Sequence, residues 1–498
     1  MKSKALRWIL GVLGVLFILS ALVMALTEYN RFSGQEVVFP GGSRVAEVPV
    51  GGLDFDAAVE RVTDFYNTPI ELVIEDSRVH VQPDDLGFTI DPAELVSEGM
   101  AQIETVTFWV FLQRQGNPSE PIAVPLAASV DEAQVRAFLE EQIVPRYMEP
   151  GIPTTPIPGT TNFTLGKPSQ NLSTDQAVED IQAALLSPTT HQVTVGIEEG
   201  EIPQVSIETL SAFLLHNLDW IGFDGLAEIY IQSMENGENL QLALRAGELV
   251  DPGIAFPAAS TNKIPIMVSV LRRTPEPTPD AVVRLLIEMI GRSENPPADT
   301  LMSVYLDEVR GPLIVSEDMA ALGLENTFLA GYFYLGAPLL QLFDTPANTR
   351  QDVFLSPDRY NQTAPPDIGR LLAAIYDCAE HGQGLLIETF PGEITQTKCQ
   401  LMIEVLLENK IGLLMEAGLP HGTSAAHKHG WAPDLDGQLR FMSDVGIVLT
   451  EDVDFVLNVF LHEPVRLDFD QGNRVIARIS QTVYNFYNLD NQAFWWFD

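Results

Sequence analysis

The hydrophobic pattern opens with a long apolar segment close to the N-terminus. Residues 8–26 are apolar over a length sufficient to cross a bilayer as a helix, and they follow Lys2, Lys4 and Arg7. Basic residues before such a segment favour a cytoplasmic N-terminus with the rest of the chain outside. A cleaved signal peptide is the alternative, but the apolar segment exceeds a usual signal core and its cleavage site is poor. We expect residues 1–34 to form a cytoplasmic stub, an uncleaved anchor and a tether.

Short helical and alternating patterns follow and predict α+β modules. Residues 54–66 carry apolar side chains at helical spacing, and residues 70–74 and 79–81 alternate as the two strands of a hairpin. A related order of elements begins again near Pro121. We expect one α+β module at residues 35–120 and a second module, with a linker, at 121–222.

The C-terminal half mixes strands and helices in another order. Residues 226–232 and 240–245 alternate as the strands of a hairpin. A turn of small residues then leads into an apolar run, and residues 280–290 and 366–376 have helical periodicity. We expect residues 223–498 to form a single domain of the α/β (α+β) class.

Composition and charge narrow the function classes. The chain has 498 residues, of which 46% are hydrophobic and 19% charged, as in a globular protein. Its formal net charge of −40 argues against nucleic acid and against an anionic membrane surface as partners, because both attract clusters of Lys and Arg. Contact with a membrane is therefore expected only through the N-terminal helix.

Ser260 and Lys263 form a Ser-x-x-Lys pair where the small-residue turn meets the apolar run. If a helix begins at the serine, both side chains share one face. A lysine that burial and nearby charge keep neutral can take the proton of a serine hydroxyl, and N–H groups at a helix N-terminus can stabilise an oxyanion. By itself the same pattern is also typical of a capped helix with a solvated lysine.

Two further pairs follow along the chain. Ser293-x-Asn295 ends a helical pattern, and Lys428-x-Gly430 precedes a β-rich segment. With Ser-x-x-Lys, Ser-x-Asn and Lys-x-Gly in this order, the chain resembles the class A β-lactamases and penicillin-binding serine hydrolases. The resemblance implies a β-lactamase/transpeptidase-like catalytic domain at the C-terminal end.

The resemblance also implies a role for each residue of these pairs. Ser260 would be the nucleophile that forms an acyl-enzyme, with Lys263 as the base of acylation, a role disputed in class A enzymes between the lysine and a glutamate acting through water. Ser293 would relay a proton to the leaving nitrogen, and Asn295 would hold the amide of the substrate side chain. Lys428 would set the electrostatics of the pocket and help to fix Ser293.

The segment after Lys428 would bind substrate. The backbone N–H groups of Ser260 and Trp431 would form the oxyanion hole, next to Gly430. His429 stands where the family has Thr or Ser, whose hydroxyl helps to hold the substrate carboxylate. We expect its imidazole to donate a hydrogen bond in place of that hydroxyl and to be cationic at mildly acid pH.

A second departure concerns release of the acyl group. Class A enzymes carry a Glu-x-x-Leu-Asn loop whose glutamate activates the deacylating water, and residues 343–361 contain no such glutamate. Asp344, Asp352 and Asp358 lie in this segment without the required spacing. We expect acylation by β-lactams to proceed and turnover to be slow.

Cys378 and Cys399 are the only cysteines. An extracytoplasmic location favours their oxidation to a disulfide. Neither has a neighbouring His or second Cys at metal-ligand spacing, so we expect no metal and no cofactor.

These observations predict a membrane-anchored, extracytoplasmic serine hydrolase that acts on β-lactam or peptidoglycan stem-peptide amides. The order of a Gly-containing strand, a helix, a hairpin and a Leu-Gly turn within residues 35–120 resembles modules assigned to peptidoglycan binding in cell envelopes. A spacer that binds nothing is an equal alternative for this module. The alternative for the whole chain is a cell-wall-binding envelope protein whose transpeptidase-like domain is catalytically weak or inactive.

Overall fold

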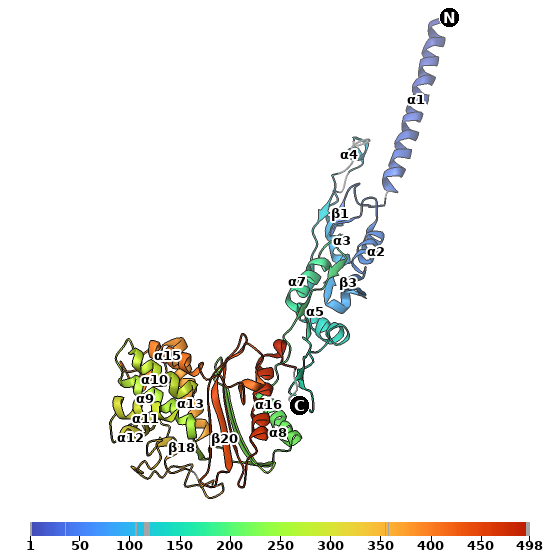
Figure 1. Ribbon diagram of the computed structural model, residues 1–498. Coiled ribbons are helices and arrows are strands. Elements are labelled where there is room, and N and C mark those ends of the chain that lie inside the picture. Colours follow the sequence, from blue (N-terminus) through green and yellow to red (C-terminus); the bar gives the residue numbers. More distant parts are fainter. Residues whose placement is uncertain are drawn as a thin grey trace. The chain divides into compact units, whose positions relative to one another are not determined.

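The computed structural model describes residues 2–34, 36–104, 107–113, 120–353, 355–356 and 358–494 (Figure 1). Gln35 of the expected tether, two residues of the 343–361 segment and the last four residues of the expected C-terminal domain lie outside this range. The chain divides into two compact units. The N-terminal unit comprises residues 1–152 and 168–202, and the C-terminal unit comprises residues 153–167 and 203–498.

The first element is the apolar helix α1, Lys2–Ser33. Within it, the segment Leu6–Ser33 contains an 18-residue window with a mean hydropathy of 2.8, and none of this window is buried in the protein. At 1.5 Å per residue, a helix of this length exceeds the roughly 30 Å of a bilayer's hydrocarbon core. The helix is therefore long and apolar enough to span a membrane, as a signal sequence also can be.

Strands from both halves of residues 35–202 share sheets in the N-terminal unit. Strand β1 (Arg44–Val45) pairs in parallel with β6 (Ala123–Val124), and β3 (Ile70–Ile74) pairs in parallel with β11 (Gln192–Thr194). Their buried side chains form a single hydrophobic core. The expected division into separate modules at residue 121 is therefore corrected, because neither segment buries its apolar face alone.

The remaining elements of the N-terminal unit are β2 (Val48–Pro49), α2 (Phe55–Tyr66), β4 (Ser77–Val81), η1 (Pro83–Leu86), β5 (Phe88–Ile90), α3 (Pro92–Ala101), α4 (Phe108–Gln113), β7 (Ala128–Val130), α5 (Glu132–Phe138), η2 (Leu139–Ile143), α6 (Val144–Tyr147), β10 (Gln170–Leu172), α7 (Thr174–Leu185) and β12 (Ile197–Glu199). The predicted helix at 54–66 and hairpin at 70–81 are confirmed. Asp54 caps α2 by accepting the N–H of Ala57 at 2.9 Å.

The C-terminal unit contains a six-stranded antiparallel sheet in the order β15-β14-β13-β21-β20-β19. Strand β13 (Leu226–Ser233) is buried on both faces, with Tyr230 in one hydrophobic core and Ile229 and Ile231 in the other. Side chains alternate along a strand, so a sheet between two cores needs apolar residues at successive positions.

Helices cover both faces of this sheet (Figure 1). Helices α8 (Ile207–Ile221) and α16 (Phe469–Tyr487) lie on one face. A helical cluster that includes α9 (Lys263–Arg273) and α13 (Pro365–His381) lies on the other. Strand β19 (Ser424–Pro433) is at the edge of the sheet, so one side of its backbone is free of strand pairing. This edge strand contacts the turn η3 (Ala259–Asn262), which carries Ser260.

The remaining elements of the C-terminal unit are β8 (Thr155–Pro156), β9 (Phe163–Thr164), β14 (Asn239–Arg245), β15 (Glu248–Val250), β16 (Phe256–Pro257), η3 (Ala259–Asn262), α9 (Lys263–Arg273), α10 (Asp280–Gly291), α11 (Asn295–Tyr305), α12 (Gly311–Ala321), β17 (Phe328–Leu329), β18 (Asn361–Thr363), α14 (Leu385–Thr389), α15 (Gln396–Leu406), η4 (Glu416–Gly418), β20 (Leu439–Leu449), β21 (Phe455–His462) and η5 (Leu489–Asn491).

The C-terminal unit begins earlier than the expected boundary at residue 223. Helix α8 packs its apolar face in the core beneath α16, and Phe163 contacts Phe213 and Phe486 at centroid distances of 5.2 and 6.2 Å. Residues 153–167 and 203–222 therefore belong with the C-terminal unit and not with a linker. The sequence did not reveal this because the contact between Phe163 and Phe486 joins positions more than 300 residues apart.

The disulfide between Cys378 and Cys399 is confirmed, and it joins α13 to α15 with Cα atoms 5.8 Å apart.

Candidate active site

Ser260 lies in the short 3-10 turn η3 and is partly exposed. Two buried asparagines hold this turn. Asn262 Nδ2 donates to Asn361 Oδ1 at 2.6 Å and to the carbonyl of Phe328 at 3.0 Å, and Asn361 Nδ2 donates to the carbonyl of Ala259 at 2.7 Å. These bonds tie the serine turn to the small sheet formed by β16, β18 and β17.

The turn differs from the expected α-helix start. Regular α-helix begins only at Lys263, and Ala259 has a φ of 46°, which is strained for a residue with a Cβ. In a 3-10 turn the side chains at positions i and i+3 eclipse each other. Ser260 and Lys263 therefore still share a face, for a different geometric reason.

Lys263 is fully buried, and its ammonium is held by polar atoms from the next helix connection. Its Nζ donates to the carbonyl of Ser293 at 2.6 Å and to Asn295 Oδ1 at 3.0 Å, with Ser293 Oγ at 3.5 Å. Burial lowers the pKa of Lys263 to about 8, against the opposing charges of Asp299 and Glu294. A neutral amine is thus accessible near neutral pH, as a general base requires.

Ser293 occupies the connection between α10 and α11. Its φ of 59° lies in the left-handed region, which is uncommon for serine. Both its carbonyl and its hydroxyl contact Lys263. The strained backbone of Ser293 therefore occurs at its contact with Lys263, and such strain is typical of functional sites.

The edge strand β19 brings the Lys-x-Gly pair to the serine turn. Lys428 is fully buried, and burial together with the charge of Lys263 holds its pKa well below the usual value of a lysine. A Cβ on Gly430 would lie 2.8 Å from the carbonyl of Ala258 and 3.0 Å from Thr261 Cγ2. Only glycine therefore lets the strand backbone approach the turn this closely.

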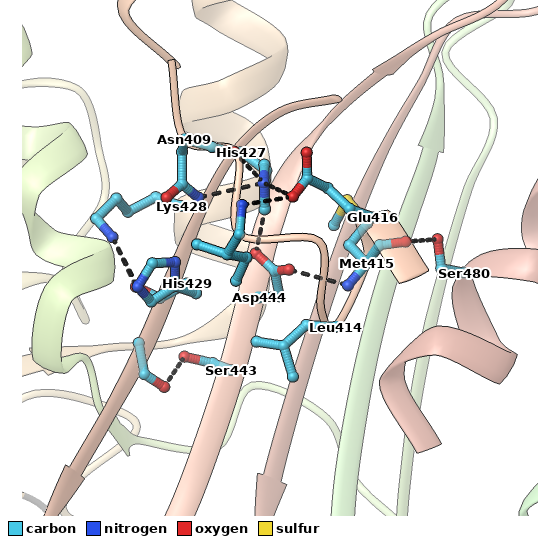
Figure 2. Close-up of polar contacts among 12 residues, drawn as sticks. Asn409, Leu414, Met415, Glu416, His427, Lys428, His429, Ser443, Asp444 and Ser480 are labelled. Carbon is cyan, nitrogen blue, oxygen red and sulfur yellow. Dashed lines mark hydrogen bonds and ion pairs between the residues drawn. The ribbon is translucent and has the colours of Figure 1, made fainter. Parts of the chain in front are cut away.

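His429 stacks on Trp431, with ring centroids 4.4 Å apart, and its Nε2 lies 3.5 Å from Lys428 Nζ (Figure 2). Burial and the charges of Lys428, His427 and Lys263 lower the pKa of His429 to about 2. The expectation of a cationic imidazole at mildly acid pH is therefore wrong, because the site is buried and already cationic. His429 Nδ1 is buried and has no hydrogen-bond partner among the described residues.

A buried charge cluster behind Lys428 was not predicted. His427 Nδ1 lies 2.8 Å from Asp444 Oδ1, and Nε2 lies 2.7 Å from the carbonyl of Asn409 and 3.7 Å from Glu416 Oε2 (Figure 2). Burial alone would lower the pKa of His427, but the two carboxylates outweigh it and raise the pKa to about 9. The cluster fixes β19 against β20 and η4.

Two residues near Lys263 were also missed. The ring of Phe333 lies 5.5 Å from Lys263 Nζ, and Asp299 Oδ1 accepts the N–H of Phe333 at 2.7 Å. Asp299 follows Asn295 by four residues on α11, so helical spacing was the available signal for it. No sequence pattern pointed to Phe333, since its loop is irregular.

The three aspartates of residues 343–361 are either engaged in hydrogen bonds or ion pairs with other groups or exposed to solvent. Asp352 is ion-paired with Arg350, whose hydrogen bond holds the pKa of Asp352 well below its usual range. Asp358 accepts the N–H of Tyr360 at 2.8 Å, and Asp344 is exposed. Among the described residues, none of the three aspartates forms a hydrogen bond or ion pair with Ser260, Lys263 or Ser293.

Known proteins with similar features were compared with the chain. Residues 281–487 match the model of the Beta-lactamase enzyme family, a range that includes Ser293, Asn295 and the Lys-x-Gly pair but begins after Lys263. No curated protein matches the sequence.

Several solved structures are similar to the chain. The TLA-1 extended-spectrum β-lactamase is 16% identical, with 56% of this chain and 98% of that one covered and a TM-score of 0.40. A β-lactamase from Chitinophaga pinensis is 17% identical (56% and 99% covered, TM-score 0.40). PBP-A is 17% identical (58% and 98% covered, TM-score 0.40).

The family match and the geometry agree on the same half of the molecule. An antiparallel sheet covered by helices on both faces carries Lys428 on its edge strand, opposite the helix connection that carries Ser293. The residues 281–487 that match the Beta-lactamase enzyme family therefore form part of a β-lactamase-like α/β domain.

Proposed function

We propose that this protein is an active-site serine hydrolase of the β-lactamase/penicillin-binding type. The observation that carries the proposal is the buried ammonium of Lys263, three residues after Ser260 and in contact with Ser293 and Asn295. A buried amine whose pKa is lowered to about 8 can accept the proton of a serine hydroxyl. Ser260 attacks a lactam or peptide carbonyl, and the attack forms an acyl-enzyme.

The other residues of the site complete this mechanism. Ser293 relays the proton to the leaving nitrogen, and Asn295 holds the amide of the substrate side chain. The N–H groups of Ser260 and Trp431 stabilise the oxyanion at the free edge of β19. In its protonated form, Lys428 supplies positive charge to the pocket, which attracts a substrate carboxylate.

His429 contributes a neutral donor to the same pocket. Its Nε2 faces the ammonium of Lys428, which favours the tautomer that carries its proton on Nδ1. The Nδ1 atom is buried and lacks a protein partner among the described residues. An acceptor oxygen of the substrate satisfies this donor, in place of the hydroxyl that the family uses.

The proposal also covers the location of the protein and the class of its substrate. Helix α1 holds the protein in the membrane with both units outside, and the substrate is a β-lactam or a peptidoglycan stem peptide. The N-terminal unit binds peptidoglycan or acts as a spacer. A cell-wall-binding protein with a catalytically weak domain is the second candidate, favoured by the absence of a suitably spaced glutamate in residues 343–361.

Mass spectrometry of the full chain after incubation with a penicillin and with a stem-peptide mimic tests the proposal. We expect one added acyl group on Ser260 and none on a Ser260→Ala variant. The adduct should form in a burst and then persist, because general-base help to deacylation, worth about 10² to 10⁴ in rate, is missing. An unchanged wild-type mass with several β-lactam classes would support the second candidate instead.

A further inference from the structure

Asp299 lies on the face of α11 that is turned toward the proposed base. It follows Asn295 by four residues, and residues with this spacing are neighbours on a helix surface. Asn295 accepts a hydrogen bond from Lys263 Nζ at 3.0 Å. The half-buried carboxylate of Asp299 is therefore placed one helical turn beyond a direct contact of Lys263.

The same carboxylate holds the loop that covers Lys263. Asp299 Oδ1 accepts the backbone N–H of Phe333 at 2.7 Å, and the N–H of Tyr334 also bonds to Asp299. The ring of Phe333 lies 5.5 Å from Lys263 Nζ, within the range of a cation–π contact. Carboxylate, ring and ammonium thus form one connected group, and Lys263 within it is fully buried.

The charges around Lys263 come from two elements. Asp299 and Glu294 are negative and lie on or beside α11, whereas Lys428 and the neutral His429 belong to β19. Ser293 and Asn295 are uncharged hydrogen-bond partners. Among the described residues, Asp299 is the larger of the two carboxylate influences that favour the protonated form of Lys263.

We propose that Asp299 is a positioning residue of the active site, which both fixes the Phe333 loop and supplies the negative charge that faces Lys263. The proposal rests on the proposed function, in which Lys263 is the base of acylation. The two carboxylates that act on Lys263, Asp299 and Glu294, lie on or beside α11. Asp299 sets the pH at which Lys263 becomes a base, without itself touching the reacting atoms.

The charge and the loop contact can be separated by substitution. Asp299→Asn keeps an oxygen that can accept the N–H of Phe333 but removes the charge, whereas Asp299→Ala removes both. We expect Asp299→Asn to lower the pKa of Lys263 by about one unit, the size of effect produced by a nearby opposite charge. The acid limb of the acylation rate should move to lower pH by the same amount.

Titration of 13C-labelled lysines by NMR measures the pKa of Lys263 in the full chain in detergent. Lysines are few in this sequence, and the Lys263→Ala variant identifies the signal. Glu294→Gln should cause a smaller shift than Asp299→Asn, and Glu388→Gln, at an exposed position on α14, should cause none.

Limited proteolysis measures how accessible the loop around Phe333 is to a protease. Asp299→Ala should expose the backbone near Phe333 to cleavage, and Asp299→Asn should not. An unchanged titration of Lys263 in Asp299→Asn, or equal cleavage of the two variants, would overturn the proposal. If penicillin does not acylate the wild-type protein but Asp299→Asn still shifts the titration of Lys263, the proposed function is overturned. The role of Asp299 beside Lys263 then still holds.

Discussion

At the scale of single residues, the chemistry depends on how two lysines are buried in one site. Lys263 and Lys428 are both fully buried, and the charge of Lys263 disfavours the charge of Lys428. Desolvation and like-charge repulsion lower the pKa of a lysine, while the carboxylates on the α11 side limit the effect at Lys263. The balance leaves Lys263 with a pKa of about 8, which suits proton transfer near neutral pH.

The acylation rate should therefore rise with pH through about 8 and level off above it, because the neutral form of Lys263 is the base. Lys263→Ala should lower the rate by about 10² to 10⁴ and abolish this pH dependence. Stopped-flow measurement with a chromogenic β-lactam checks both expectations.

Lys398 provides a matched control. It is also buried with a lowered pKa, but its Nζ donates to the carbonyl of Glu393 in the turn between α14 and α15. Lys398→Ala should leave the acylation profile unchanged. A normal rate and profile in Lys263→Ala would remove this lysine from the mechanism.

At the scale of elements, the site depends on one close approach between an edge strand and a turn. Strand β19 has no partner on its outer side, and the serine turn η3 packs there. Gly430 permits the approach, since a side chain would meet the backbone of Ala258 and the side chain of Thr261. The buried His427 pair with Asp444 holds the same strand from behind.

Gly430→Ala should separate β19 from the serine turn. Overpacking against backbone costs roughly 1–3 kcal/mol, so we expect lower stability together with a loss of acylation larger than that stability change explains. Thermal unfolding and acyl-enzyme formation measure the two effects. Gly41→Ala, where an added Cβ meets nothing, is the control and should change neither. Unaltered acylation by Gly430→Ala would contradict the packing argument.

The disulfide belongs to this scale as well, because it ties α13 to α15 on the helical face of the sheet. A loop of 21 residues should contribute about 3 kcal/mol through the entropy of the unfolded chain. The double variant Cys378→Ala/Cys399→Ala should unfold at lower temperature but keep its acylation, since both cysteines lie in the core away from the site. Reductant should destabilise the wild type and leave the double variant unaffected.

At the scale of the whole molecule, topology decides whether the site can meet its proposed substrate. The basic residues before α1 favour a cytoplasmic N-terminus, and in the proposed orientation both units lie outside. A protease added to intact cells should therefore remove both units, detected by antibodies to each. Protection of the C-terminal unit, with cleavage only after lysis, would reverse the orientation.

The sequence by itself determined the motifs and the strongly periodic elements. The Ser-x-x-Lys, Ser-x-Asn and Lys-x-Gly pairs, the hairpin of β13 and β14, and helix α10 follow from local spacing. In the structure Lys263 contacts Ser293 and Asn295, and Gly430 lies against the serine turn. Such features depend on neighbours within a few residues, so the chain order is enough to predict them.

Tertiary structure alone decided what joins distant segments. The pairing of β1 with β6, the place of α8 under α16, and the Asp299, Phe333 and Lys263 group all link residues that no local pattern connects. The neutral state of His429 was equally hidden, because its pKa depends on burial beside Lys428 and not on residue type. Periodicity reports which side of an element is buried, whereas only the packed fold determines what that side meets.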